Sequence, residues 1–96
     1  MHLTLYAFTT RPGKTDAVAR LYRDWLVLLR QWRPVSTELL ANPLNPDEVM
    51  LEVRFSDEDT AWRAAESAGH CAWYARLVIL AETGPLVEHY EVVEPG

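Results

Sequence analysis

The spacing of apolar residues switches several times along this chain between the pattern of a strand and the pattern of a helix. The order of these patterns constrains the fold more than any other feature of the sequence. The first run alternates residue by residue over Leu3–Thr9 and then breaks at Arg11-Pro12-Gly13. Both sides of this run are apolar, with Leu3, Leu5 and Ala7 on one and Tyr6 and Phe8 on the other. The pattern predicts a strand whose two faces must both be covered.

The second run has helical spacing from Thr15 to Trp32. Its apolar residues recur every three or four positions, at Val18, Leu21, Tyr22, Trp25, Leu29 and Trp32. This spacing predicts a long amphipathic helix. The helix should end before Pro34, because a residue preceding proline is displaced from helical geometry.

Two further strands are predicted next, over Val35–Leu40 and Val49–Phe55. The segment between them, Asn42–Asp47, is rich in Asn, Pro and Asp, which favour turns. The two strands therefore form an antiparallel hairpin. On the second of them, Val49, Leu51, Val53 and Phe55 should face the helices and Met50, Glu52 and Arg54 the opposite side.

The last third of the chain predicts two short helices and a strand. Ser56 or Asp57 can cap a helix that carries Ala61, Trp62 and Ala65. Gly69 interrupts it, and a second helical stretch runs to Glu82. One side of that stretch carries His70, Trp73, Tyr74, Leu77 and Ala81. Gly84-Pro85 ends it, and the final strand covers Leu86–Val93.

This order of elements, βαββαβ, predicts a single domain over residues 1–96. Its simplest fold is a ferredoxin-like α+β sandwich, a four-stranded antiparallel sheet with helices on one face. The helices leave one apolar side of the first strand bare, so we expect a homodimer whose sheets pack face to face. A buried Arg54 would then need a carboxylate, within or across the dimer, from Glu52, Glu38 or Glu91.

Composition excludes several classes of function. Nine Lys and Arg against fourteen Asp and Glu give a net charge of −5, which argues against a nucleic-acid partner. No apolar run approaches the ~20 residues of a membrane span, so we expect no membrane partner and a cytoplasmic location. Cys71 is the one cysteine, and no metal-ligand spacing or glycine-rich phosphate loop occurs. The sequence predicts no metal site.

Several fragments in order resemble a known family. Arg11-Pro12-Gly13-Lys14 precedes the long helix, an Asn/Pro/Asp loop precedes Glu52–Asp57, and Ala61 opens a helix that leads to Ser67-Ala68-Gly69-His70. Over essentially the whole chain the sequence resembles the antibiotic-biosynthesis monooxygenase family of small dimeric α+β-barrel proteins. That superfamily includes cofactor-free quinol and polyphenol monooxygenases, haem-degrading enzymes, isomerases and members without known activity.

The chain departs from two patterns of these relatives. The haem-degrading branch pairs an Asn on the first strand with a Trp and a His ten residues apart. Here the corresponding positions are Tyr6, Trp62 and Ala72, which argues against that branch. Many members also place a His four residues after the alanine that opens the second helix, where this chain has Ala65.

His70 is the best acid/base candidate, because an imidazole titrates near neutrality and its position fits the family. Tyr74, as a second catalytic group, or the Trp indoles could donate hydrogen bonds that stabilise the developing negative charge. The residues that could bind a flat aromatic substrate, or serve only as core, are Tyr6, Tyr22, Trp25, Trp62 and Trp73. We expect His2 and His89 to be bystanders and Cys71 to be a small buried residue.

Two hypotheses follow. The resemblance implies an oxidoreductase, a cofactor-independent monooxygenase that uses no cofactor and oxidises a small electron-rich aromatic such as a hydroquinone or polyphenol. His70 would remove a proton from a hydroxyl of that substrate. The alternative is a non-catalytic small-molecule binder, or a bare dimeric scaffold, in which His70 is only a hydrogen-bonded residue at a helix start and the aromatic residues are core.

Overall fold

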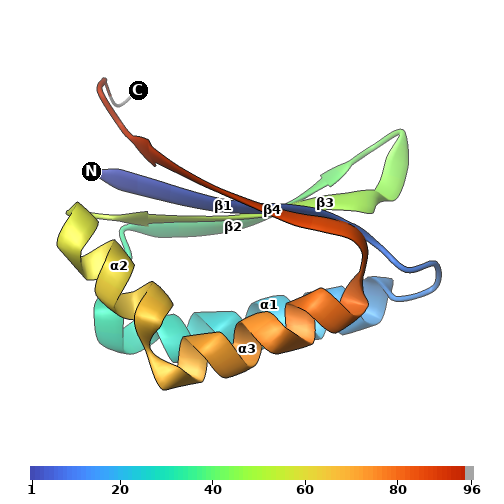
Figure 1. Cartoon of the computed structure of the whole chain (residues 1–96). Coiled ribbons are helices and arrows are strands. Elements are labelled where there is room, and N and C mark those ends of the chain that lie inside the picture. The colour runs from blue at the N-terminus through green and yellow to red at the C-terminus, as the bar shows by residue number, and fades with distance from the viewer. Residues whose placement is uncertain (95–96) are drawn as a thin grey trace.

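One sheet and a layer of helices build the fold in the computed structural model, which describes residues 1–94. The strands are β1 (His2–Thr10), β2 (Ser36–Asn42), β3 (Asn45–Phe55) and β4 (Ala81–Glu91). They form an antiparallel sheet in the order β2-β3-β1-β4. The helices α1 (Thr15–Leu29), α2 (Glu58–Glu66) and α3 (Ala68–Leu80) all cover the same face of it (Figure 1). The predicted ferredoxin-like α+β architecture is confirmed.

The core lies between this sheet and the helices. Tyr6 and Phe8 are the apolar side of β1 that faces inward, and Leu3, Leu5 and Ala7 lie on the other side. On β3 the inward row is the predicted one, Val49, Leu51, Val53 and Phe55. The helices add completely or almost completely buried Leu21, Trp25, Leu29 and Leu77. The hydrophobic pattern therefore assigned the faces of β3 correctly.

The break between α2 and α3 lies at Ser67 and not at Gly69, where the sequence placed it. Ser67 leaves helical geometry, and its hydroxyl accepts a hydrogen bond from the backbone N–H of His70 at 3.3 Å. It is therefore the N-cap of α3. Gly69 lies in the first turn of α3, where a Cβ would approach Leu28 Cδ1 to 2.8 Å. Its missing side chain lets α3 pack closely on α1.

The last strand begins earlier than predicted. The helical stretch expected to reach Glu82 ends at Leu80, because Ala81 has extended backbone angles (φ −78°, ψ 125°) and pairs with Thr10 of β1. Gly84-Pro85 therefore lies inside β4, beside a register shift, and Gly84 has the left-handed φ of 87°. The strand ends at Glu91, two residues before the predicted Val93.

Two other boundaries also differ from the prediction. Most of the loop predicted over 42–47 is strand, because β2 and β3 are joined only by Pro43-Leu44. Asn42 accepts from the Leu44 N–H at 2.9 Å and donates to the Glu48 carboxylate at 2.9 Å, so its side chain braces the hairpin. The first helix ends at Leu29 and continues as a 3₁₀ turn, η1 (Arg30–Trp32).

The face of the sheet opposite the helices is covered by no helix or strand of residues 1–94 (Figure 1). Strand register arranges its residues in three cross-strand rows: Ser36, Arg54, Leu3 and Tyr90; Glu38, Glu52, Leu5 and Glu88; Leu40, Met50, Ala7 and Leu86. We call this surface the open face. Within the described residues, neither of the two salt bridges involves Arg54, so the carboxylate expected for it is not supplied within them.

Trp73 packs α3 against the rest of the core. It is 3% exposed, its ring stacks on Trp25 with centroids 5.1 Å apart, and its indole N–H donates to the Leu21 carbonyl at 3.0 Å. We predict that Trp73→Ala lowers the free energy of unfolding by about 3 to 5 kcal/mol in urea denaturation. The half-exposed Trp62 is the control, and Trp62→Ala should cost much less. Equal losses would mean that Trp73 is not core.

Candidate active site

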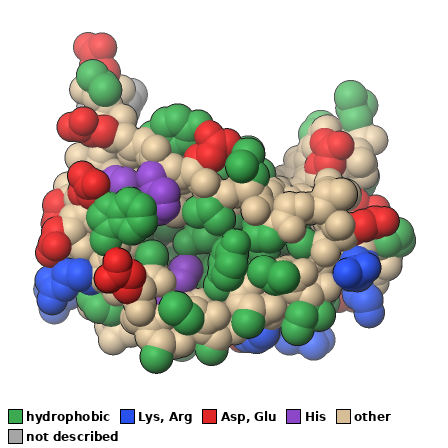
Figure 2. Space-filling model, in the orientation of Figure 1, with side chains coloured by type: hydrophobic (Ala, Val, Ile, Leu, Met, Phe, Trp, Pro, Cys, Tyr) green, Lys and Arg blue, Asp and Glu red, His purple; other side chains and the backbone are tan. Residues whose placement is uncertain are grey.

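A hollow of about 260 Å³ opens between the helices and the inner side of β4. Its lining comes from β1, α2, α3 and β4 and consists of Tyr6, Ala65, His70, Cys71, Tyr74, Val87 and His89. Figure 2 shows this side of the molecule, with hydrophobic side chains gathered in a depression and histidines visible at two places on it. We call this hollow the histidine pocket. It combines an apolar wall with two imidazoles, the usual composition of a small-molecule site.

His70 is held by hydrogen bonds from two other elements. Its Nε2 lies 3.3 Å from Trp25 Nε1 on α1 and 3.3 Å from the Tyr6 hydroxyl on β1. An indole nitrogen can only donate, so Nε2 of His70 must carry the lone pair. The Tyr6 hydroxyl then donates to the same nitrogen. The neutral ring consequently carries its hydrogen on Nδ1, which is the nitrogen left for a ligand.

Burial keeps this group of side chains uncharged. His70 is 5% exposed, and desolvation lowers its pKa to about 4, so the imidazole is neutral at pH 7. Burial, and to a smaller degree the neighbouring Tyr74, raise the pKa of Tyr6, whose hydroxyl therefore stays protonated. At neutral pH the site offers a ligand the Nδ1–H of His70 as a donor in an apolar setting.

An aromatic cluster surrounds His70 and Tyr6. The Tyr6 ring lies edge-on to Trp25 and Trp73, with centroids 5.8 and 5.7 Å apart, and 6.2 Å from Tyr74. Trp25 and Trp73 are buried behind Tyr6 and do not line the pocket. Their packing fixes the positions of Tyr6 and His70.

The seven candidate site residues therefore separate into three groups. His70, Tyr74 and Tyr6 line the histidine pocket, and Trp25 and Trp73 support it from behind. Tyr22 packs on Trp25 and donates its hydroxyl to Thr37 at 3.3 Å, away from the lining. Trp62 lies over His89, outside the lining.

Two pocket residues were not expected from the sequence. Cys71 is exposed rather than buried, because it follows His70 on α3 and its side chain is rotated away from the core. His89 lines the pocket because it pairs with Thr4, on the helix-facing side of β1. The sequence shows that His89 and Val87 lie on the same side of the last strand. It does not show that this side faces the helices, because that depends on the pairing with β1.

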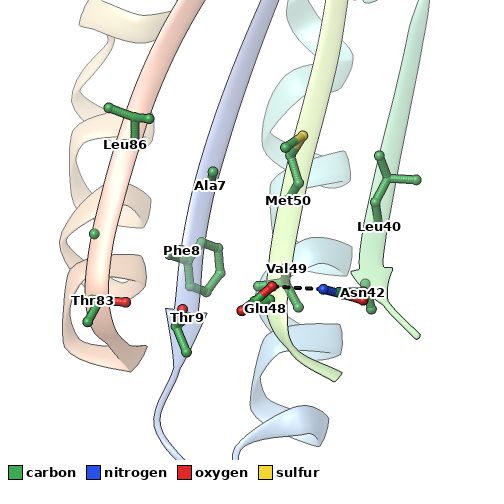
Figure 3. Close-up of a pocket in the computed structure, with 12 residues that line it drawn as sticks. Ala7, Phe8, Thr9, Leu40, Asn42, Glu48, Val49, Met50, Thr83 and Leu86 are labelled. Carbon is green, nitrogen blue, oxygen red and sulfur yellow. Dashed lines mark hydrogen bonds between the residues drawn. The ribbon is translucent and has the colours of Figure 1, made fainter. Parts of the chain in front are cut away.

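A second hollow, of about 530 Å³, lies on the open face (Figure 3). Figure 3 shows Leu40, Met50 and Leu86 around it, with the Asn42 amide bonded to the Glu48 carboxylate at its end. It contains no histidine or cysteine, and Glu48 already has a hydrogen-bond partner. This apolar hollow suits packing against another surface better than it suits acid/base chemistry.

Within residues 1–94, no three side chains of His, Cys, Asp or Glu lie close enough together to bind a metal ion. None of the helices described has the length and apolar character that crossing a membrane requires.

Comparisons with known proteins identify shared architecture. No protein-family model and no curated protein sequence matches the chain. Among solved structures, a mutant form of SnoaB of Streptomyces nogalater, described as a cofactor-independent oxygenase, superposes with a TM-score of 0.84 at 16% identity. The superposition covers 98% of this chain and 94% of SnoaB.

Two further solved structures carry the name putative antibiotic biosynthesis monooxygenase. The one from Nitrosomonas europaea has a TM-score of 0.81 at 16% identity, over 98% of this chain and 100% of that one. The one from Caulobacter crescentus has a TM-score of 0.83 at 12% identity, over 97% and 90%. The resemblance seen in the sequence is thus confirmed as a shared fold.

The buried imidazole of His70 should make the protein acid-sensitive. The unfolded state protonates His70 near pH 6.5 and the folded state only near pH 4, so the unfolded state binds more protons between these values. The contribution of neutral His70 to the free energy of unfolding is complete above pH 6.5, and on the order of 3 kcal/mol of it is lost as the pH drops to 4. Urea denaturation across this range should show a smaller loss for His70→Gln. Equal losses in both proteins would contradict a buried neutral His70.

Proposed function

We propose that this protein is a cofactor-independent monooxygenase that oxidises a small electron-rich aromatic bearing a hydroxyl group, such as a hydroquinone or polyphenol. The observation that carries the proposal is the neutral His70, which offers Nδ1–H in an apolar pocket also lined by Tyr6 and Tyr74. The fold shared with SnoaB, described as a cofactor-independent oxygenase, supports the same class of reaction.

In this reaction the substrate supplies the electrons. A phenol anion transfers one electron to dioxygen, and the two radicals combine as a peroxide at a ring carbon. Protonation of the peroxide and loss of water, which takes the hydrogen of that carbon, leave a carbonyl there. The overall change is one phenol and one O₂ to one quinone and one water. The protein must hold the anion, exclude water and manage one proton.

His70 stabilises the substrate anion by donation. The sequence suggested His70 as the proton acceptor, but its Nε2 lone pair already accepts from Trp25 and Tyr6. With its pKa lowered to about 4 by burial, the ring is also a weak base at pH 7. We assign its Nδ1–H to the substrate oxygen, where negative charge develops. Tyr74, on the next turn of α3, is the candidate second donor.

Oxygen consumption with a panel of hydroquinones and naphthols tests this function. The wild type should consume O₂ above background, and His70→Ala should reduce the rate by about 10²-fold or more, the usual effect of losing a donor to a developing oxyanion. His70→Gln keeps an amide donor and should retain more activity than His70→Ala. The control is Val78→Ala, at an exposed position of α3. No oxygen consumption, or an unchanged rate in His70→Ala, would contradict the proposal.

A non-catalytic binder is the second candidate. It is favoured by the observation that the indole N–H groups of Trp25 and Trp73 already have partners inside the protein, as core residues do. A binder should show an increased melting temperature with particular aromatics without turnover, whereas a scaffold should respond to none.

We also propose that the working unit is a homodimer whose open faces pack together. The open face carries apolar Leu3, Leu5, Leu40, Met50 and Leu86, and the hollow of Figure 3 lies within it. Its charges suit a second copy, because the row containing Arg54 lies beside the row containing Glu38, Glu52 and Glu88. Antiparallel apposition of two such faces lets each Arg54 meet carboxylates of the other copy.

Analytical ultracentrifugation at micromolar concentration tests this assembly. We predict a dimer, and an increase of about tenfold or more in the dissociation constant for Arg54→Ala, which corresponds to about 1.4 kcal/mol. Arg63→Ala is the matched control, since Arg63 is an exposed residue of α2 paired with Asp59. A monomer of 11.0 kDa would contradict the dimer, and an unchanged dissociation constant would exclude Arg54 from the interface.

A further inference from the structure

A pair of histidines lies at the edge of the histidine pocket. Antiparallel pairing of β1 and β4 sets Thr4 opposite His89, and His2 lies two residues before Thr4 on the same side of β1. His2 Nε2 lies 3.1 Å from His89 Nδ1, and the Thr4 hydroxyl lies 3.1 Å from the same Nδ1. The ring centroids are 5.3 Å apart, which is close to the 3.1 Å between the two nitrogens plus the distance from each nitrogen to the centre of its own ring. The two nitrogens therefore point at each other.

This geometry fits a shared proton and not a metal ion. Two imidazole nitrogens that face each other at 3.1 Å are joined by one N–H···N hydrogen bond. A metal ligated by both would have to lie away from the line between them, with both lone pairs turned toward it. The absence of a cluster of three ligands within residues 1–94 agrees with this interpretation.

His2 is buried and His89 is half-buried, and the pair lies near an acid. His2 and Thr4 are 7% and 4% exposed, and the Trp62 ring lies over His89 with centroids 4.3 Å apart. The Trp62 indole N–H donates to the Glu58 carboxylate at 3.0 Å, which holds this cover in place. The groups that face His89 from the surrounding elements are His2, Glu58, Tyr6, His70, Cys71 and Tyr74.

Burial and the neighbouring His2 lower the pKa of His89, and Glu58 opposes them in part. His89 is therefore neutral at pH 7, and it differs from His70 in that its ring nitrogen without a hydrogen bond within the described residues can carry the lone pair. Its Nδ1 is engaged with His2 and Thr4, and both of these groups can accept a hydrogen bond. In the tautomer that carries hydrogen on Nδ1, this hydrogen is donated to them, and Nε2 carries the lone pair available to a ligand. His89 and His70 line the same pocket, and His70 has no free lone pair there.

We propose that His89 is the catalytic proton acceptor of the histidine pocket, and that His2 is a positioning residue that takes up the charge through the imidazole pair. This inference rests on the proposed function, because it supplies the proton acceptor that the oxygenase reaction needs. It assigns complementary tasks to the two pocket histidines. His70 donates to the substrate oxygen, and His89 removes the hydrogen from it.

The proton of the substrate hydroxyl moves only between the substrate, His89 and His2. The substrate O–H bond breaks, its electron pair stays on the oxygen, and the proton bonds to His89 Nε2. The proton on His89 Nδ1 then shifts to His2 Nε2, so that the positive charge is shared by two rings. When O₂ has taken the electrons of the substrate, the shift reverses and His89 returns the proton to the outer peroxide oxygen. The O–O bond then breaks, and this oxygen leaves as water with the hydrogen of the ring C–H, whose bonding electrons form the new carbonyl.

Anaerobic binding of 2-naphthol tests the acceptor without any oxidation. The neutral and ionised forms of this probe have different absorbance spectra, so the pH at which the bound probe ionises can be followed directly. In the wild type we expect ionisation at least one pH unit below that of free 2-naphthol. His89→Gln should remove this shift, a change of at least tenfold in the ionisation constant, and His2→Gln should remove part of it. Val78→Ala, at an exposed position of α3 outside the pocket lining, is the control and should leave it unchanged.

Nitrogen-15 NMR of the wild type gives a second measurement that needs no variant. Binding of 2-naphthol should add one proton to the His2 and His89 pair while His70 stays neutral. A wild type that leaves the probe unbound or neutral, or a His89→Gln variant that ionises it as the wild type does, would overturn the acceptor role. If the probe ionises through His89 but no hydroquinone consumes O₂, the acceptor role stands and the oxygenase function fails.

Discussion

The hydrogen bonds to one buried nitrogen, Nε2 of His70, connect most of this structure. Trp25 from α1 and the Tyr6 hydroxyl from β1 both approach it at 3.3 Å, so a single atom joins the sheet and both long helices. Because the indole can only donate, the same contact sets the tautomer of His70. The packing of the core thereby determines which ring nitrogen of His70 is left free of these partners.

The two faces of the sheet differ in cover and in composition. The helices cover one face, and at its edge the inward residues of β1 and β4 form the wall of the histidine pocket. The open face carries apolar rows together with Arg54 and a row of glutamates, and has no cover within the described residues. The sheet therefore separates the histidine pocket from the surface that we propose for dimer formation.

The sequence predicted the features that follow from local periodicity. The alternation from Val49 to Phe55 assigned the inner face of β3, and helical spacing placed Trp73 in the core. It did not predict where α3 ends, because Ala81 continues the apolar stripe of the helix and only its pairing with Thr10 makes it strand. It also missed His89, whose place in the pocket depends on the register between β4 and β1. The spacing of apolar residues along the chain does not reveal which strands pair with each other or in what register.

Nitrogen-15 NMR of the imidazole ring tests most directly whether His70 is a neutral donor held by Trp25 and Tyr6. The two ring nitrogens of a neutral histidine have distinct chemical shifts, which identify the protonated one. We predict hydrogen on Nδ1 and a lone pair on Nε2 at pH 7, with no protonation of the ring until the pH approaches 4. A hydrogen on Nε2, or a charged ring at pH 6, would contradict the account.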